Sequence, residues 1–246
     1  MTVHPRVCVS GISTWNQSLA EDVLLYEELG VHTIGAALRK IEGTADVELL
    51  LSSGLAVANV IGVGHAGLPH AVEVAVRLGA PAIVFTTGPA GPVEWDDAAD
   101  TFAASVAPHL PAPVRLCLEH TNSLRHDVSF VHTLRDAIDL ARRLDIHVCM
   151  EINACWAERD LARTIADGID RIGIVQVSDF AIGTLSTPNR LVPGDGDIPL
   201  PRIIRQVLDA GYEGVFDLEL VGPKIEEEGY RSAIARSCDY LSELLP

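Results

Sequence analysis

The sequence predicts a single-domain (β/α)8 barrel, the TIM-barrel fold of the α/β class. Short apolar segments alternate with longer amphipathic ones, and the alternation repeats eight times along 246 residues. Such alternation indicates parallel strands connected by helices, and eight units in a chain of this length are typical of a closed barrel. Because no composition break, charge block or low-complexity segment interrupts the pattern, we expect one domain over residues 1–246.

An open, doubly wound sheet is the alternative that fits the same alternation. A dinucleotide-binding sheet of that kind has a GxGxxG segment after a strand and at the start of a helix. The nearest match here, GVGHAGLPH after the third predicted strand, is poor. The barrel is therefore the favoured architecture.

Helix boundaries follow from capping residues and from apolar spacing. Ser18 is a plausible N-cap and Gly30 lies just past the end of the first predicted helix, while Pro69 falls in the first turn of the third. Apolar residues recur at helical spacing across 129–144. The predicted strands cover 7–11, 31–37, 57–64, 81–88, 114–120, 147–152, 171–179 and 214–220. The predicted helices cover 18–30, 44–53, 69–79, about 95–108, 129–144, 158–167, 200–211 and 225–244.

The composition limits the partners that the protein can have. The net charge is −16, and a surface of this charge repels nucleic-acid backbones and anionic lipid. We expect a small-molecule substrate and no nucleic-acid or membrane partner, and the helical exterior leaves room for a homodimer. The five cysteines are scattered without a CxxC pair, which is typical of reduced thiols. With no signal peptide or apolar run of about 18 residues, we expect a cytoplasmic protein.

Four predicted strands end on a polar side chain. The apolar run HVCME stops at Glu151, and the same position holds Glu119 in RLCLEH and Glu219 in VFDLEL. In RIGIVQVSD it holds Gln176. Active sites of (β/α)8 barrels lie at the carboxyl ends of the strands, so these four side chains are expected to converge.

Converging carboxylates need protons or a cation to neutralise them. An all-oxygen set of ligands suits a hard divalent cation, so we expect Mn²⁺ or Mg²⁺. Taken singly, a carboxylate at a strand end often caps the next helix or pairs with an arginine. Asp217 lies two residues before Glu219, and Arg115 lies four residues before Glu119. Both should point into the barrel, and we expect them to form part of a buried ionic layer there.

The segment from about residue 114 to the C-terminus resembles the xylose isomerase-like TIM-barrel family of sugar and sugar-phosphate isomerases and epimerases. The resemblance is carried by the phrases LCLEH, MEINACWAERDL and RIGIVQVSDF, and most specifically by RLVPGDGDIPLPRIIRQVLDAGYEGVFDLELVGP. It implies a divalent metal held by residues on the last four strands. It also implies carbohydrate metabolism as the setting.

The family resemblance assigns roles position by position. The implied metal ligands are Glu119, Glu151, Gln176 and Glu219, and the implied pair that shuttles a proton through an enediolate is Glu119 and Glu219. Arg190 matches a substrate-binding arginine, and Asp179 matches an aspartate that supports the site from behind.

The sequence departs from the family pattern at two positions. The family often carries Asp-x-x-His on the sixth strand, whereas here Glu151 is followed by Ala154. Gln176 stands where the family has a histidine ligand, and an amide oxygen binds metals more weakly than imidazole does. Both departures bear on metal retention and on substrate identity.

Three further residues are candidates for substrate binding: His65 at the end of the third strand, His120 beside Glu119, and Trp15 after the first strand. Lys40 could carry a phosphate group, but we expect it to be solvated.

The leading hypothesis is a metal-dependent isomerase or epimerase of a sugar or a related hydroxy-carbonyl compound. A lyase (dehydratase) acting at the same site is one alternative, because abstraction of an α-proton can end in loss of hydroxide. The other alternative is a metal-free member of the fold that performs acid/base chemistry or binds a ligand.

Overall fold

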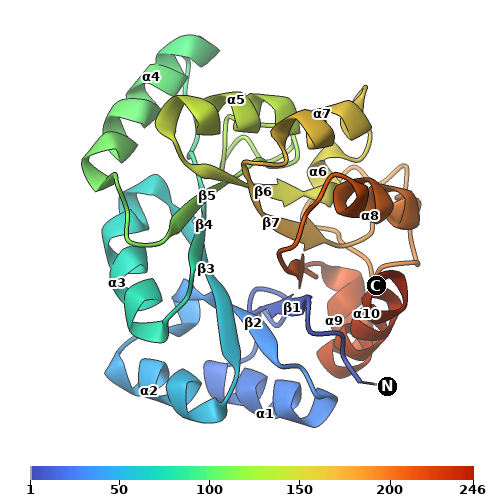
Figure 1. The fold of residues 1–246 in the computed structure, drawn as a ribbon. Helices are drawn as coiled ribbons and strands as arrows, with labels where there is room; N and C mark the ends of the chain where they lie inside the picture. The colour runs from blue at the N-terminus through green and yellow to red at the C-terminus, as the bar shows by residue number, and fades with distance from the viewer. Residues whose placement is uncertain (1) are drawn as a thin grey trace.

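The computed structural model describes residues 2–246 and contains a closed barrel of eight strands, β1 to β8, in sequence order. Neighbouring strands are parallel, and β8 pairs with β1 to close the barrel. The helices surround the strands on the outside (Figure 1). The predicted (β/α)8 fold is therefore confirmed. The strands are β1 Val7–Ser10, β2 Thr33–Ala37, β3 Ala56–Gly64, β4 Ala82–Thr86, β5 Arg115–Glu119, β6 His147–Glu151, β7 Ile172–Val177 and β8 Phe216–Leu218.

The α-helices follow the strands in the expected order. They are α1 Leu19–Leu29, α2 Thr44–Ser53, α3 Leu68–Leu78, α4 Trp95–Val106, α5 Leu134–Leu144, α6 Ile152–Cys155, α7 Leu161–Gly168, α8 Leu200–Asp209, α9 Pro223–Glu228 and α10 Tyr230–Leu244. Three short 3-10 helices, η1 Leu38–Lys40, η2 His65–Gly67 and η3 Ala107–His109, complete the set. Within residues 2–246, no helix has the length and apolar character to cross a membrane.

The helix boundaries differ most from the sequence prediction at the fifth and the last predicted helices, and α6 was not predicted. The fifth begins at Leu134 rather than at residue 129, because Thr133 has extended backbone and its side chain accepts a hydrogen bond from the Asp136 backbone N–H. The last helix is divided into α9 and α10 by Gly229, whose φ of 92° breaks the helical path. Ser18 does cap α1, and Glu21 completes a capping box with it.

Alternation along the strands determines which side chains face the inside of the barrel. In β5, Leu116 and Leu118 pack in the large apolar layer beneath the helices, whereas Cys117 packs in a small separate cluster with Cys149 and Ile174. Glu119, Glu151 and Gln176 lie two residues beyond these three and therefore share their inward direction. The period of two thus places the strand-end polar groups above the barrel interior. All five cysteines are buried and free, as expected for reduced thiols.

The expected buried pair of Asp217 and Arg115 does not form. Arg115 is the first residue of β5, and its side chain is exposed at the amino end of the barrel. Asp217 is buried and instead accepts a hydrogen bond from the Asn59 side chain, 3.3 Å from Nδ2 to Oδ2. Burial raises the pKa of Asp217 to about 7. The strand pattern does not predict solvent access, and at the first residue of β5 the Arg115 side chain is exposed.

Lys40, expected to be solvated, is largely buried. Its Nζ lies 2.6 Å from the Asp22 carboxylate on α1, and the two side chains are only 5% and 2% exposed. Nζ also donates to the backbone oxygen of Thr14 at 2.8 Å. The burial of Asp22 raises its pKa to about 6, although the Lys40 charge opposes that rise. This ion pair joins α1 to the ends of β1 and β2.

Removing one partner of this pair should leave an uncompensated buried charge. We expect Lys40→Met to lower the free energy of unfolding by about 3–5 kcal/mol at pH 8. The loss should be smaller at pH 5, because below its raised pKa Asp22 takes up a proton and becomes neutral. Urea unfolding of the variant at both pH values measures this, and the double variant Asp22→Leu/Lys40→Met should recover most of the loss. An equal loss at the two pH values would show that Asp22 is not the group left charged.

Candidate active site

A cavity of about 740 Å³ opens at the carboxyl ends of the strands. Its wall includes Gly64 and Thr86, the last residues of β3 and β4, together with Glu119, Glu151 and Glu219 at the ends of β5, β6 and β8. The size falls within the range of roughly 300–1,000 Å³ that is common for small-molecule sites. The cavity therefore lies where barrel enzymes carry their active sites.

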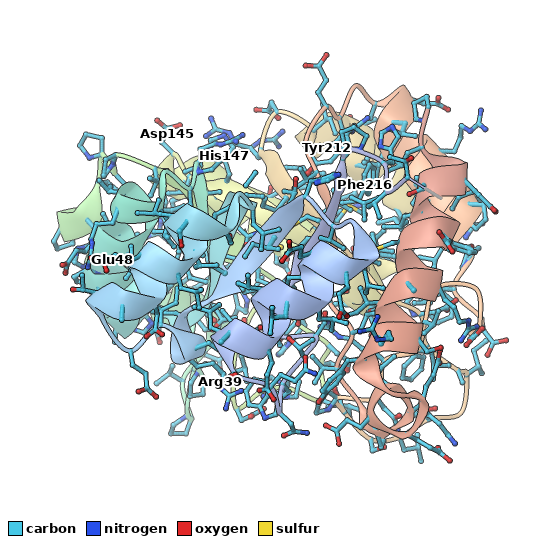
Figure 2. The ribbon with its side chains drawn as sticks, turned by 90° about the horizontal axis from the view of Figure 1, so that it is seen from below. Arg39, Glu48, Asp145, His147, Tyr212 and Phe216 are labelled. Carbon is cyan, nitrogen blue, oxygen red and sulfur yellow. The ribbon has the colours of Figure 1, made fainter. Side chains whose placement is uncertain are left out.

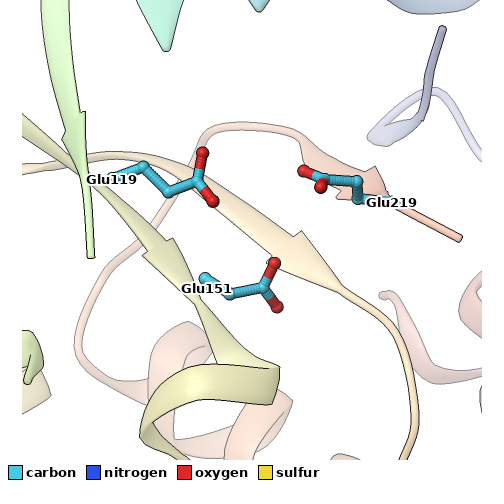
Figure 3. A group of neighbouring side chains, drawn as sticks. All are labelled: Glu119, Glu151 and Glu219. Atoms are coloured by element: carbon cyan, nitrogen blue, oxygen red, sulfur yellow. The ribbon is translucent and has the colours of Figure 1, made fainter. Parts of the chain in front are cut away.

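The three glutamates converge inside this cavity. Figure 3 shows Glu119, Glu151 and Glu219 on separate strands with their carboxylates turned toward one another. One carboxylate oxygen from each lies within 4.8 Å of the others. Glu151 and Glu219 are buried, and Glu119 is half-buried. The convergence expected from the strand-end pattern is thus observed for all three carboxylates.

Gln176 and Arg190 connect two of these carboxylates. The Gln176 amide donates to Glu219 from the neighbouring strand, and Gln176 is completely buried. Arg190 lies in the long segment between β7 and α8, and its guanidinium is 2.7 Å from Glu219 Oε1 and 2.8 Å from Glu151 Oε2. It also donates to the Glu219 backbone oxygen. Arg190 was expected as a substrate ligand; it lines the cavity and also serves as the counter-ion of the cluster.

The shared location changes the acidity of the carboxyl groups. Burial, reinforced by the charges of Glu219 and Glu151, raises the pKa of Glu119 well above its ordinary range. Burial also raises the pKa of Glu151, to about 7, against the opposing effect of Arg190. For Arg190 itself, burial opposes the charge, but the neighbouring glutamates outweigh it and raise the pKa. Burial and the neighbouring carboxylates thus favour the protonated form of Glu119.

Asp179 organises the segment that carries Arg190. Its buried carboxylate accepts hydrogen bonds from the backbone N–H groups of Phe180, Gly194 and Ile198, at 2.8, 2.8 and 3.0 Å. A Cβ atom on Gly196 would collide with this carboxylate, so the close approach requires glycine there. Asp179 is not among the described residues that line the cavity, and it acts on the site through the segment that carries Arg190.

Trp15 lines the cavity and remains 43% exposed. Arg39, which the sequence did not single out, lies over it: the guanidinium carbon is 3.9 Å from the centre of the Trp15 ring. Figure 2 shows Arg39 at the opposite end of the barrel from Asp145 and His147, which precede and begin β6. The position directly after β2 was the only signal in the sequence that could have identified it.

His65 and His120, expected as substrate ligands, are not among the described residues that line the cavity. His65 packs edge-on against Phe102, and its Nδ1 is 2.8 Å from the Thr87 backbone oxygen. His120 follows inward-facing Glu119 and so points outward, where it is buried and accepts a hydrogen bond from the Glu151 backbone N–H. Burial lowers the pKa of His120 to about 3 and keeps it neutral. His120 therefore contacts the strand that carries Glu151.

Comparison with known proteins identifies the class of protein. Residues 62–240 match the family described as "Xylose isomerase-like TIM barrel". The match covers more than half of the chain, and the chain belongs to this family. No curated protein sequence matches it significantly.

Solved structures share the whole fold at low sequence identity. A protein from Sinorhizobium meliloti 1021 has a TM-score of 0.89 at 21% identity, over 98% of both chains. The IolI protein with a bound zinc atom has a TM-score of 0.79 at 16% identity, over 97% of both chains. An L-ribulose 3-epimerase has a TM-score of 0.71 at 18% identity, over 99% of this chain and 94% of its own. At these identities the likeness establishes the fold.

Asp179→Asn should loosen the segment that delivers Arg190. An amide has one acceptor oxygen, and its NH₂ group would face backbone N–H groups. We therefore expect Asp179→Asn to lower the free energy of unfolding by roughly 2–3 kcal/mol. Asp195→Asn is the matched control in the same segment: its carboxylate is 42% exposed and pairs with Arg236, so the change should cost less than about 1 kcal/mol. Chemical denaturation of both variants measures the difference. Equal losses would show that Asp179 does not organise the segment.

Proposed function

We propose that the protein is an isomerase or epimerase of a sugar or a related small hydroxy-carbonyl compound. The observation that carries this proposal is the convergence of Glu119, Glu151 and Glu219 on one cavity in a barrel of this family. The L-ribulose 3-epimerase with the same fold supports it. Moving a proton at a carbon beside a carbonyl group needs an acid and a base within reach of the same substrate, and the cavity holds both.

The environments of Glu119 and Glu219 assign them different roles. Glu219 accepts hydrogen bonds from Arg190 and Gln176, which orient its carboxylate in the cavity and suit it to act as the base. Glu119 keeps its proton because it is desolvated and faces two other carboxylates, so it acts as the acid. One oxygen of each lies within 4.8 Å of the other, so both groups reach the same small substrate. Two carboxyl groups in different environments, one suited to give a proton and one to accept it, are the pattern that such chemistry requires.

The reaction then follows from these residues. The Glu219 carboxylate removes the proton from the carbon next to the substrate carbonyl, and the electron pair of that C–H bond moves to the carbonyl oxygen, giving an enediolate. The Arg190 guanidinium lies in the cavity and stabilises the negative charge on that oxygen. For epimerisation, Glu119 returns a proton to the opposite face of the same carbon, and the carbonyl group re-forms. For isomerisation, Glu119 protonates the former carbonyl carbon, the hydroxyl proton of the first carbon moves to the former carbonyl oxygen, and the first carbon becomes the new carbonyl carbon. Glu219 then loses its proton to solvent and Glu119 takes one up, which restores the starting state.

The same residues fit a divalent metal ion. Glu119, Glu151 and Glu219 provide oxygen ligands within 4.8 Å of one another. The buried Gln176 Oε1 has no hydrogen-bond partner within residues 2–246, and it could serve as the fourth ligand. A divalent ion bound there would polarise the substrate carbonyl as a Lewis acid. An all-oxygen set favours Mn²⁺ or Mg²⁺, whereas the related IolI protein is described with zinc.

One observation favours a metal-free version of this chemistry. Arg190 already neutralises part of the negative charge of Glu151 and Glu219, so the cluster tolerates its own carboxylates without an added ion. In that version Arg190 alone polarises the carbonyl group, and the roles of Glu119 and Glu219 do not change.

Metal binding is measured by thermal unfolding of chelator-treated protein with added Mn²⁺, Mg²⁺, Co²⁺ or Zn²⁺. At a metal concentration 100 times the dissociation constant, we expect stabilisation of about 2.7 kcal/mol. Glu219→Gln should remove the effect, whereas Glu213→Gln, which changes an exposed glutamate outside the cavity, should keep it. No stabilisation by any of the four ions would favour the metal-free version.

Proton transfer is tested by exchange of the α-hydrogen of ketoses with D₂O, followed by NMR. We expect exchange in the wild type and a loss of about 10²–10⁴-fold in Glu119→Gln or Glu219→Gln, the usual contribution of a general acid or base. Glu213→Gln should exchange at the wild-type rate. NMR of the products separates epimers and isomers from the dehydrated product of a lyase. Wild-type exchange in both cavity variants would contradict the proposed roles.

A further inference from the structure

The cavity wall near the ends of β1 and β2 contains an arginine, Arg39, that forms no ion pair with the described residues. Arg39 lies in η1, directly after β2, and lines the cavity with Trp15. No carboxylate oxygen of the described residues lies within 4.0 Å of its guanidinium. The other two arginines of the cavity wall are paired: Arg190 with two glutamates, and Arg125 with Asp127 through two hydrogen bonds of 2.9 and 3.1 Å.

Arg39 is nevertheless held in place. Its Nη1 donates to the Trp15 backbone oxygen at 2.6 Å, and the guanidinium is stacked on the Trp15 ring. The next residue, Lys40, donates in the same way to the backbone oxygen of Thr14 at 2.8 Å. Two consecutive side chains after β2 thus bind two consecutive carbonyls after β1. The resulting platform is prepared before any ligand arrives, which lowers the entropy lost on binding.

Most of the hydrogen-bonding capacity of Arg39 remains available. A guanidinium has five N–H donors in a planar fork, and within residues 2–246 the only acceptor that Arg39 meets is the Trp15 carbonyl. A stacked guanidinium with open donors matches the geometry of a carboxylate or a phosphate. Glu226 also lines the cavity, but its Oε1 accepts from the Asn16 side chain at 3.0 Å.

We propose that the platform formed by Arg39 and Trp15 binds an anionic group on the substrate, so that the substrate is a sugar acid or a sugar phosphate rather than a neutral sugar. The anion would lie over the strand ends of β1 and β2, while the reacting carbon lies at the glutamates on β5, β6 and β8. Because the charged group and the reacting carbon bind at separate places, the substrate has one orientation in the cavity. This inference rests on the proposed function, because it describes the substrate of the same site.

The test compares three ketoses that differ only at the last carbon: D-fructose, D-fructuronate with a carboxylate, and D-fructose 6-phosphate. Isothermal titration calorimetry measures their dissociation constants for the wild type, Arg39→Gln, Arg39→Lys and the control Arg77→Gln. Arg77 is an exposed arginine on α3 that does not line the cavity.

We expect at least one anionic ketose to bind the wild type roughly 10–100 times more tightly than D-fructose, as charge-assisted hydrogen bonds predict. Arg39→Gln should lose that preference, because it weakens binding of the anionic ketoses more than binding of D-fructose. Arg39→Lys should keep part of the preference, and Arg77→Gln should keep all of it. Which ketose is preferred identifies the anion as a carboxylate or a phosphate. The proposal is overturned if D-fructose binds as tightly as both anionic ketoses, if neither anionic ketose binds at millimolar concentration, or if Arg39→Gln retains the preference.

Binding and turnover fail independently. If the anionic ketose binds preferentially through Arg39 but its α-hydrogen does not exchange, the result supports the anion-binding platform and contradicts the proposed function. Exchange of D-fructose at the rate of its anionic analogues would keep the proposed function and contradict the platform.

Discussion

The site depends on how three carboxylates are kept together in a desolvated barrel mouth. Isolated buried carboxylates are costly, and like charges at this distance raise each other's pKa. Two features reduce this cost: Arg190 bridges Glu151 and Glu219, and the raised pKa of Glu119 favours its neutral form. The same arrangement provides an acid and a base, so the chemistry proposed here follows from the way the charge is neutralised.

Several other features support Arg190. It belongs to a long segment without regular structure, which would be mobile if its backbone groups had no partners. Asp179 prevents this by accepting three backbone hydrogen bonds from that segment. At the ends of β1 and β2, the buried pair of Lys40 and Asp22 holds the segments that form the platform of Arg39 and Trp15. The glutamate cluster and the platform can therefore bind different parts of one small molecule.

The sequence was sufficient for the fold and for the convergence of Glu119, Glu151, Gln176 and Glu219, because strand periodicity and parallel topology place them without knowledge of packing. It was insufficient wherever the outcome depended on solvent access or on the path of a loop. Lys40 and Arg39 are adjacent, yet the expected surface residue is the buried one, and the residue not singled out lines the cavity. His120 lies next to Glu119 but faces away from the cavity. The ion pairs of Arg190 cross between segments far apart in sequence, so no local pattern encodes them.

The central claim is that Glu119 carries the proton that the reaction returns to the substrate. Infrared difference spectroscopy of metal-free protein at pH 7 tests it directly, because a protonated carboxyl group has a C=O stretch separate from the bands of carboxylates. The account predicts that the spectrum of the wild type minus that of Glu119→Gln contains a protonated carboxyl band. A carboxylate band lost in Glu119→Gln would contradict the account, because Glu119 would then have no proton to give.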